Sequence, residues 1–152
     1  MKKNTKNEIA DFFDSKKFAV AGVSRETSKF GRLVYQSMKK KGYPVVPINP
    51  HVNEIDSDKC YQSVDDLPPD VDALVVLTKE KETTEVVKKA ISKNIKKIWI
   101  QQQSENVETI AFAEQEGALL IVHECILMFM EPVEGFHKFH RWIKNIFGAN
   151  PR

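Results

Sequence analysis

The sequence is poor in cysteine, and neither sign of charge dominates it. Two cysteines among 152 residues, Cys60 and Cys125, are too few for the disulfide framework of a small secreted domain. The 23 Lys and Arg residues nearly balance the 21 Asp and Glu residues, so the formal net charge is +2. The sequence carries no basic stripe interleaved with aromatic side chains, which argues against a nucleic-acid partner.

Long hydrophobic runs are also missing. The longest apolar stretches lie between Ala118 and Met130, and His123 and Glu124 interrupt them, so they are far too short to span a bilayer. The first seven residues are polar and lysine-rich, and no signal peptide is visible. We therefore expect a cytoplasmic protein without a membrane partner. A chain of this length fits one core, so we expect a single domain over residues 1–152.

Five short, apolar, β-rich runs are present instead. They cover residues 18–23, 45–48, 73–77, 98–100 and 118–122. Each run is continuous rather than alternating, which is typical of parallel strands that are buried on both faces.

Helical patterns separate these runs, at residues 31–41, 80–93 and 105–116. We expect their apolar side chains to face inward, namely Leu33, Val34 and Met38, then Val86, Val87, Ala90 and Ile91, and last Val107, Ile110, Ala111 and Phe112. The alternation predicts an α/β fold, a Rossmann-like doubly wound parallel sheet of about five strands. Residues 5–15 and 134–147 predict an extra N-terminal and an extra C-terminal helix.

The loop after the first strand carries several features that suit a phosphate. Gly22 has no side chain to obstruct an anion, and Ser24, Thr27 and Ser28 offer hydroxyl groups. Positive charge comes from Arg25 and Lys29. Gly31 stands where the next helix begins, so free N–H groups can face an anion. The spacing is neither the dinucleotide G-x-G-x-x-G nor the P-loop pattern, and a plain polar connection remains the alternative.

The end of the second strand points away from NAD. Dinucleotide sites commonly place an acidic residue there to bind the ribose hydroxyls. This chain has Asn49, Pro50 and His51 instead, which suit a ligand with an additional ribose phosphate, as coenzyme A has. A stiff exit turn without a function is the alternative.

Taken together, these residues resemble a known family. The segments that carry the resemblance are Val20-Ala-Gly-Val-Ser24, Lys29-Phe-Gly31, Gly42-Tyr-Pro-Val-Val-Pro-Ile-Asn-Pro50, Tyr61-Gln-Ser-Val-Asp-Asp-Leu-Pro68, Val71-Asp-Ala-Leu-Val-Val76 and Ile98-Trp-Ile-Gln101. In this order they are similar to the small CoA-binding domain proteins, whose fold is like the CoA-binding domain of succinyl-CoA synthetase α subunits. The resemblance covers residues 18–125.

The resemblance implies a site for CoA or acyl-CoA at the carboxyl edge of the sheet. It places Gly22, Val23 and Ser24 near the diphosphate, Arg25 and Lys29 on phosphates, Phe30 and Gly31 at the helix start, Asn49 and Pro50 near the ribose, Thr78 beside the adenine, and Gln101 on the pantetheine path. Two departures stand out. Residues 102–104 read Gln-Gln-Ser where the family often has a glycine, and residues 126–128 read Ile-Leu-Met where many relatives have Pro and Lys.

Two further constellations have structural alternatives. His123 with Cys125 and His137 with His140 could together hold zinc, but we favour packing of the terminal helix against the sheet as the role of His137 and His140. Cys125 could meet the CoA sulfur, or be an inert buried thiol, and Cys60 is expected in a polar loop without a role. Asp65, Asp66 and Asp70 end a short helix rather than form a catalytic carboxylate site.

We therefore predict a CoA-binding protein that is noncatalytic or regulatory, with no catalytic residue and no metal ligand assigned. Two alternatives stay open. One is an NAD(P)-dependent oxidoreductase, or a CoA-dependent transferase subunit, that needs a partner. The other is an interaction protein whose C-terminal helix forms a homo-oligomer.

Overall fold

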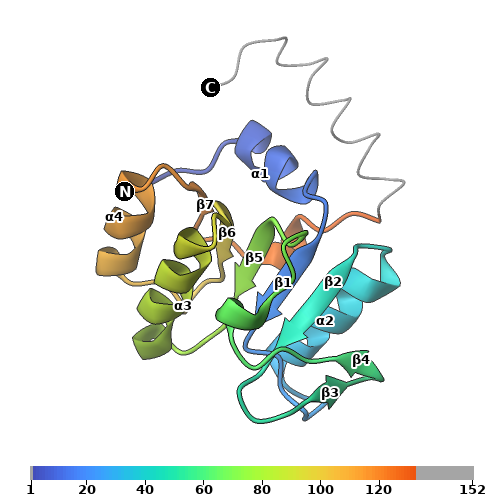
Figure 1. The fold of residues 1–152 in the computed structure, drawn as a ribbon. Coiled ribbons are helices and arrows are strands. Elements are labelled where there is room, and N and C mark those ends of the chain that lie inside the picture. Colours follow the sequence, from blue (N-terminus) through green and yellow to red (C-terminus); the bar gives the residue numbers. More distant parts are fainter. Residues whose placement is uncertain (1, 133–152) are drawn as a thin grey trace.

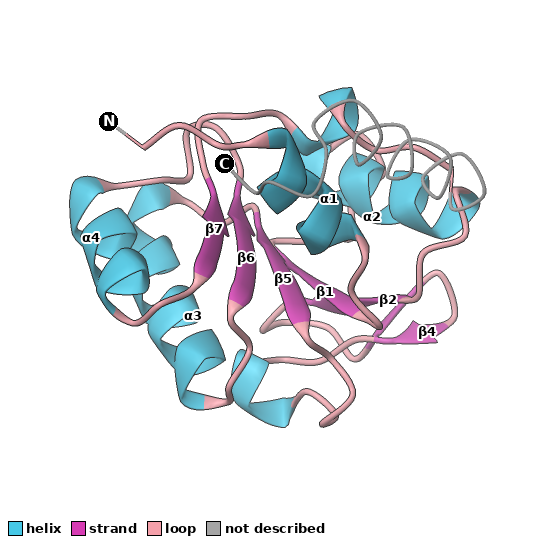
Figure 2. Ribbon diagram, turned by 90° about the horizontal axis from the view of Figure 1, so that it is seen from above, coloured by secondary structure: helices cyan, strands magenta, loops and turns pink. Residues whose placement is uncertain are grey.

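The computed structural model describes residues 2–132, and these form one parallel sheet with helices on both faces (Figures 1 and 2). The sheet strands are β1 (Phe18–Ala21), β2 (Val45–Ile48), β5 (Ala73–Val76), β6 (Lys97–Ile100) and β7 (Leu119–Ile121). The α-helices are α1 (Lys6–Phe13), α2 (Phe30–Lys40), α3 (Glu80–Ser92) and α4 (Val107–Gln115). The predicted α/β fold with about five strands is confirmed. The predicted helix at residues 134–147 lies outside the described residues.

Alternation along the buried strands builds two cores. On β1, Phe18 and Val20 face the layer of α1 and α2, whereas Ala19 and Ala21 face the layer of α3 and α4. Trp99 of β6 is fully buried in the first core, where its ring packs 5.4 Å from that of Phe12. Because both faces are covered, the strands read as unbroken apolar runs rather than as alternating ones.

Local sequence fixes the ends of the helices. Thr5 and Glu8 form a capping box at the start of α1, in which the Thr5 hydroxyl accepts from the Glu8 amide at 3.1 Å. The Asn106 side chain caps α4 by accepting from the Thr109 amide at 2.8 Å. Lys29 stands at the N-cap of α2 without a side-chain cap, so the start of that helix is left open.

Three helix side chains expected to face inward do not. Leu33 is 47% exposed, Val107 is 85% exposed, and Ala111 is also exposed. On α4 the buried positions are Thr109 and Ala113, because the Thr109 hydroxyl pairs with that of Thr84 on α3 at 2.6 Å. A polar contact therefore sets the face of α4, which a count of apolar residues alone does not reveal.

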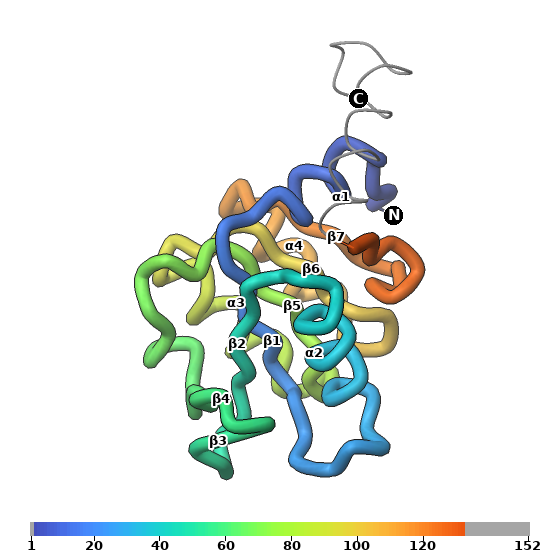
Figure 3. Tube along the Cα trace, turned by 90° about the vertical axis from the view of Figure 1, so that its right-hand side faces the viewer, coloured from blue at the N-terminus to red at the C-terminus, as the bar shows by residue number. Residues whose placement is uncertain are grey.

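Between β2 and β5 the chain forms a small hairpin and a 3-10 turn. Strands β3 (Glu54–Ile55) and β4 (Asp58–Lys59) pair antiparallel, and η1 (Val64–Asp66) follows, as expected for a short helix that ends at the aspartates. The hairpin turn at Asp56 and Ser57 has positive φ angles of 52° and 66°. Figures 1 and 3 show the hairpin at the same end of the molecule as the connection from β1 to α2.

Side chains and loops cover both edges of the sheet. At the β7 edge, Asn4 accepts from the Val122 amide at 3.1 Å and donates to its carbonyl at 2.6 Å. At the β2 edge, Tyr61 donates its amide to the Pro47 carbonyl and accepts from the Asn49 amide. Among residues 2–132, no helix is long and apolar enough to cross a membrane.

Candidate functional site

The carboxyl ends of β1 and β5 define the centre of the candidate site. The strand order is β2-β1-β5-β6-β7, so the chain runs outward from β1 to β2 and then returns to the other side of β1. Such a reversal opens a crevice beyond the carboxyl ends of the two central strands, where α/β folds bind ligands. In this chain the residues at that point are Gly22, which follows β1, and Leu77 and Thr78, which follow β5.

Glycine at position 22 is required by this close approach. The φ angle of Gly22 is 96°, and a Cβ atom there would lie 2.7 Å from the Leu77 carbonyl oxygen. The amides of Gly22 and Val23 both donate to the Ile48 carbonyl, at 3.3 and 3.4 Å. The backbone of β1 is thus held against both neighbouring strands at the point where it leaves the sheet, with the Val23 side chain buried in the core.

The loop that follows Gly22 returns to it at the start of α2. A Cβ atom on Gly31 would lie 2.0 Å from the Gly22 carbonyl oxygen, so the two glycines pack backbone against backbone. The first amides of an α-helix have no intrahelical acceptor, and the positive end of the helix dipole lies there. Residues 22–31, which we call the phosphate-loop candidate, therefore form a tight arch that ends in unpaired helix amides.

The polar side chains of the phosphate-loop candidate face solvent. Arg25 and Lys29 are exposed, and Lys29 lies 3.8 Å from Glu26 in an exposed ion pair that contributes little stability. The Ser24 hydroxyl accepts from the Glu26 amide at 3.0 Å, which closes a local turn and leaves the hydroxyl proton free to donate. The cations are thus available to an anion that approaches from outside.

Asn49 joins the end of β2 to this arch. Its side-chain amide donates to the Val23 carbonyl at 2.8 Å, and its Oδ1 accepts from the His51 amide at 2.8 Å. Pro50 follows and is exposed. Both polar atoms of the Asn49 side chain have partners within the protein, so in this structure Asn49 orders the loops.

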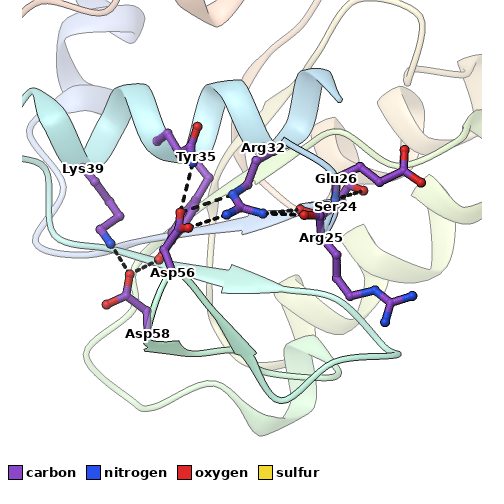
Figure 4. A network of polar contacts seen from close by, with 9 residues as sticks. Ser24, Arg25, Glu26, Arg32, Tyr35, Lys39, Asp56 and Asp58 are labelled. Carbon is purple, nitrogen blue, oxygen red and sulfur yellow. Dashed lines mark hydrogen bonds and ion pairs between the residues drawn. The ribbon is translucent and has the colours of Figure 1, made fainter. Parts of the chain in front are cut away.

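Arg32 lies behind the arch and was not among the residues expected from the sequence (Figure 4). It is 7% exposed, and its Nη1 donates to the carbonyls of Ser24 at 3.2 Å and Arg25 at 2.8 Å. Its Nε and Nη2 bind the two carboxylate oxygens of Asp56 on the hairpin, the first at 3.2 Å. One guanidinium therefore ties the hairpin turn to the phosphate-loop candidate.

A sequence signal for this contact exists, although it is weak. Arg32, Tyr35, Gln36 and Lys39 are spaced by three and four residues, which places them on one face of α2. All four meet the hairpin. Gln36 donates to Asp56 at 3.2 Å, while the Tyr35 hydroxyl and the Lys39 ammonium both bind Asp58. The acidic partners Asp56 and Asp58 then complete a charge match that the helix face alone only suggests.

These contacts shift the pKa values of Asp56, Asp58 and Tyr35. Hydrogen bonds from Arg32 and Gln36 lower the pKa of Asp56 below its ordinary value of 3.8, and those from Lys39 and Tyr35 lower the pKa of Asp58. Burial, followed by the Asp58 hydrogen bond, raises the pKa of Tyr35. At neutral pH the two aspartates are therefore anionic and Tyr35 is a neutral donor.

A pocket of about 480 Å³ lies beside the arch. Its walls come from α2 and from the loops that follow β5, β6 and β7; they include Phe30, Thr78, Gln101, Ser104 and Cys125. Four residues that the sequence singled out, from segments far apart in the chain, thus border one cavity. Phe30, near the end of the phosphate-loop candidate, is also part of the pocket wall, so the two features adjoin at the carboxyl edge of the sheet.

Gln101 is the buried polar group of the pocket. It is 5% exposed, and its Oε1 accepts from the Ile126 amide at 3.0 Å, which fixes the side chain. Within residues 2–132 its Nε2 has no protein acceptor. The pocket therefore contains an oriented N–H donor that a bound molecule can use.

A second hollow, of about 620 Å³, lies at the starts of α3 and α4, with Lys79, Thr84 and Asn106 among its walls. Asn106 already donates to the Glu80 carbonyl and caps α4, and Thr84 pairs with Thr109. Its polar groups are thus engaged in helix packing. We favour the pocket beside the arch as the ligand site, because it adjoins the crevice between β1 and β5.

The remaining candidates are resolved in part. His123 bonds the Glu105 carboxylate through Nδ1 at 2.9 Å, and residues 2–132 contain no group of three or more potential metal ligands. His137 and His140 lie outside the described residues. Cys60 lies in the loop that follows β4, as expected, but its side chain is only 4% exposed and packs among core side chains, and this burial raises the pKa of its thiol.

Comparison with known proteins gives a consistent family. Residues 16–131 match a family model described as a CoA binding domain. The chain is 25% identical to the uncharacterized protein YneT of Bacillus subtilis over 83% of this chain and 94% of that protein. It is 31% identical to the ADP-forming acetate–CoA ligase II of Archaeoglobus fulgidus, over 74% of this chain but 17% of the ligase. A solved structure of a conserved hypothetical protein from Pyrococcus furiosus is 35% identical, with a TM-score of 0.73, over 76% of this chain and 99% of that one.

Proposed function

This chain belongs to the CoA-binding domain family, and from that membership we propose that it binds CoA or acyl-CoA at the carboxyl edge of its sheet and catalyses no reaction by itself. We further propose that residues 1–152 act as a single domain in this role. The observation that carries the proposal is the tight arch of residues 22–31, whose open helix start faces the crevice between β1 and β5.

The diphosphate would lie on the arch. Gly22 and Gly31 let the end of β1 and the start of α2 pack backbone against backbone, which would place the unpaired amides at the start of α2 beside the diphosphate. Since the amides of Gly22 and Val23 already bind Ile48, these two residues would border the diphosphate without donating to it. The Ser24 hydroxyl would donate to a phosphate oxygen, while Arg25 and Lys29 would neutralise its charge.

The two ends of the ligand would then lie on either side of the arch. Toward β2, Asn49 and Pro50 would border the ribose without the carboxylate that NAD sites use. Toward β6, the pocket with Phe30 and Gln101 would take the pantetheine arm, whose amide carbonyls suit the free Nε2 donor of Gln101. Thr78 borders the same pocket, and the family resemblance implies that it would lie beside the adenine.

A binding role without a reaction is favoured by what the site contains. The described residues of the site offer amides, hydroxyls, exposed cations and the Cys125 thiol, and among them no base forms a hydrogen bond with that thiol. The ligase from Archaeoglobus fulgidus, of which this chain spans 17%, carries much additional sequence. We therefore propose that any chemistry on the bound thiol would be performed by a partner.

Calorimetric titration with CoA, dephospho-CoA and NAD tests the proposal. We expect CoA to bind most tightly, because the additional ribose phosphate has no acidic residue to repel it. NAD that binds as tightly as CoA would overturn the preference and favour an oxidoreductase. Turnover of acyl-CoA or NAD(P)H by the isolated protein would overturn the noncatalytic role.

Charge variants locate the phosphates. Arg25→Ala and Lys29→Ala should each weaken CoA binding by about 1–3 kcal/mol, the scale of a charge-assisted hydrogen bond. Lys96→Ala is the matched control, because it removes an exposed lysine at the opposite edge of the sheet, just before β6. Unchanged affinity in both loop variants would remove residues 22–31 from the site.

A further inference from the structure

The guanidinium of Arg32 touches the phosphate-loop candidate from the side opposite to solvent. Its Nη1 is shared by two consecutive carbonyls, those of Ser24 and Arg25, at 3.2 and 2.8 Å. Arg32 itself is 7% exposed, so it makes these bonds from inside the protein, whereas Arg25 and Lys29 are on the surface. A bound anion would therefore meet the surface cations and not Arg32.

Because the peptide bond is planar, the bonds from Arg32 to these carbonyls also fix the direction of the N–H groups that follow them. In a trans peptide, the carbonyl of one residue and the N–H of the next point in opposite directions. No cis peptide occurs in the described residues. Because Arg32 draws the Ser24 carbonyl inward, it turns the Arg25 N–H outward, away from the guanidinium. The next N–H, of Glu26, is taken by the Ser24 hydroxyl at 3.0 Å.

Arg32 is itself fixed by the hairpin. Asp56 binds the guanidinium with both carboxylate oxygens, which is the geometry that gives an Arg–carboxylate pair its directionality. Asp56 is also bound by Gln36 at 3.2 Å, and it stands in a turn at a positive φ of 52°. A left-handed turn without glycine is costly, so this ion pair is one of the contacts that keep the turn in place.

We propose that Arg32, held by Asp56, is a positioning residue that orients the Ser24 and Arg25 peptides of the phosphate-loop candidate before the ligand binds. The inference deepens the proposed function and rests on it. The hairpin of β3 and β4 then influences affinity although it need not touch the ligand, because it determines where the Ser24 and Arg25 peptides point. By linkage, ligand binding should in turn stabilise the contact between the hairpin and α2.

Three variants separate positioning from general stability. Asp56→Asn keeps Arg32 but removes the charge of its partner. Arg32→Lys keeps the positive charge but cannot bind the carboxylate and two carbonyls in one plane. Asp58→Asn is the matched control: it weakens the contacts of the same hairpin with Tyr35 and Lys39, whereas the side chain of Asp58 forms no hydrogen bond with the described residues 22–31.

Each variant is measured by CoA titration, by urea unfolding, and by amide hydrogen exchange of residues 24–26 without ligand. We expect CoA affinity to fall about tenfold or more in Arg32→Lys and severalfold in Asp56→Asn, with faster exchange at Arg25 in both. Asp58→Asn should lose comparable stability but keep wild-type affinity and wild-type exchange at Arg25.

The outcomes are distinguishable. Wild-type protein that fails to bind CoA overturns the proposed function, and this is visible before any variant is made. Wild-type binding with unchanged affinity in both Arg32→Lys and Asp56→Asn overturns the inference alone. Equal loss of affinity in Asp58→Asn and Asp56→Asn also overturns it, since the hairpin would then act through stability and not through Arg32.

Discussion

Replacement of Gly31 by alanine is the sharpest test of the arch. Ordinary contact begins at about 3.4 Å, whereas the new Cβ would lie 2.0 Å from the Gly22 carbonyl oxygen, so the two backbone segments must separate by about 1.4 Å. No flexible side chain is involved that could simply move aside. Either the first turn of α2 or the end of β1 has to shift.

The expected loss of stability combines two opposing effects. Overpacking costs about 1–3 kcal/mol, and a backbone clash belongs at the upper end of that range. Alanine in place of glycine in a helix returns at most about 1 kcal/mol. The net loss of about 2 kcal/mol should lower Tm by about 4–8 °C for a chain of this size. CoA affinity should fall more than tenfold, because the shift displaces the helix start that would hold the diphosphate.

Gly117→Ala is the matched control for this variant. Gly117 has a φ of 76°, and a Cβ atom added to it would meet no other atom within 4 Å, so alanine there costs about 1–2 kcal/mol of backbone strain without a clash. It should lose similar stability and retain CoA affinity. A Gly31→Ala protein with a Tm at or above that of the wild type would refute the reasoning, since helix propensity alone predicts that result.

Two more predictions follow from the acidities. Asp56 has a lowered pKa in the folded protein, so its contribution to stability is fully present well above 3.8 and is lost as the pH falls from 3.8 through the folded pKa. The difference in urea midpoint between wild type and Asp56→Asn should therefore be clear at pH 7 and narrow steadily below pH 3.8. A gap that keeps its full pH 7 size as the pH falls below 3.8 would show that the carboxylate charge is not its source. Cys60 is buried and the pKa of its thiol is raised, whereas Cys125 is half-buried at the pocket. A thiol-reactive disulfide reagent near pH 8 should therefore modify Cys125 first. In Cys125→Ser, the remaining reaction of Cys60 should be slow and should accelerate when the protein unfolds. Fast labelling of Cys125→Ser would contradict the burial of Cys60.

The sheet was predictable because strands buried on both faces require unbroken apolar runs. The strands predicted at residues 45–48 and 73–77 differ from the observed strands by no more than one residue. Gly42 and Gly117 follow the ends of α2 and α4 at positive φ, as expected for glycines that end helices. The phosphate-loop candidate was also recognisable, since its polar residues stand between a clear strand and a clear helix. The local sequence is enough to predict a segment's structure where one property dominates it, such as hydrophobicity in the strands or polarity in the loop.

The remaining features depend on contacts between distant segments. The hairpin of β3 and β4 has two residues in each strand and a turn at Asp56 and Ser57 without glycine, so neither periodicity nor turn composition indicates it. Arg32 looks like a solvated helix residue until Asp56 is placed opposite it. Cys60 lies among polar neighbours in the sequence, yet the hairpin folds it into the core.

The contacts at the two sheet edges limit how copies of this protein can assemble. The Asn4 amide occupies the backbone groups of Val122 that a neighbouring strand would need, and Tyr61 does the same for Pro47 and Asn49 on the other side. A continuous intermolecular β-sheet is therefore disfavoured at both ends. Self-association would then proceed through helical or loop surfaces.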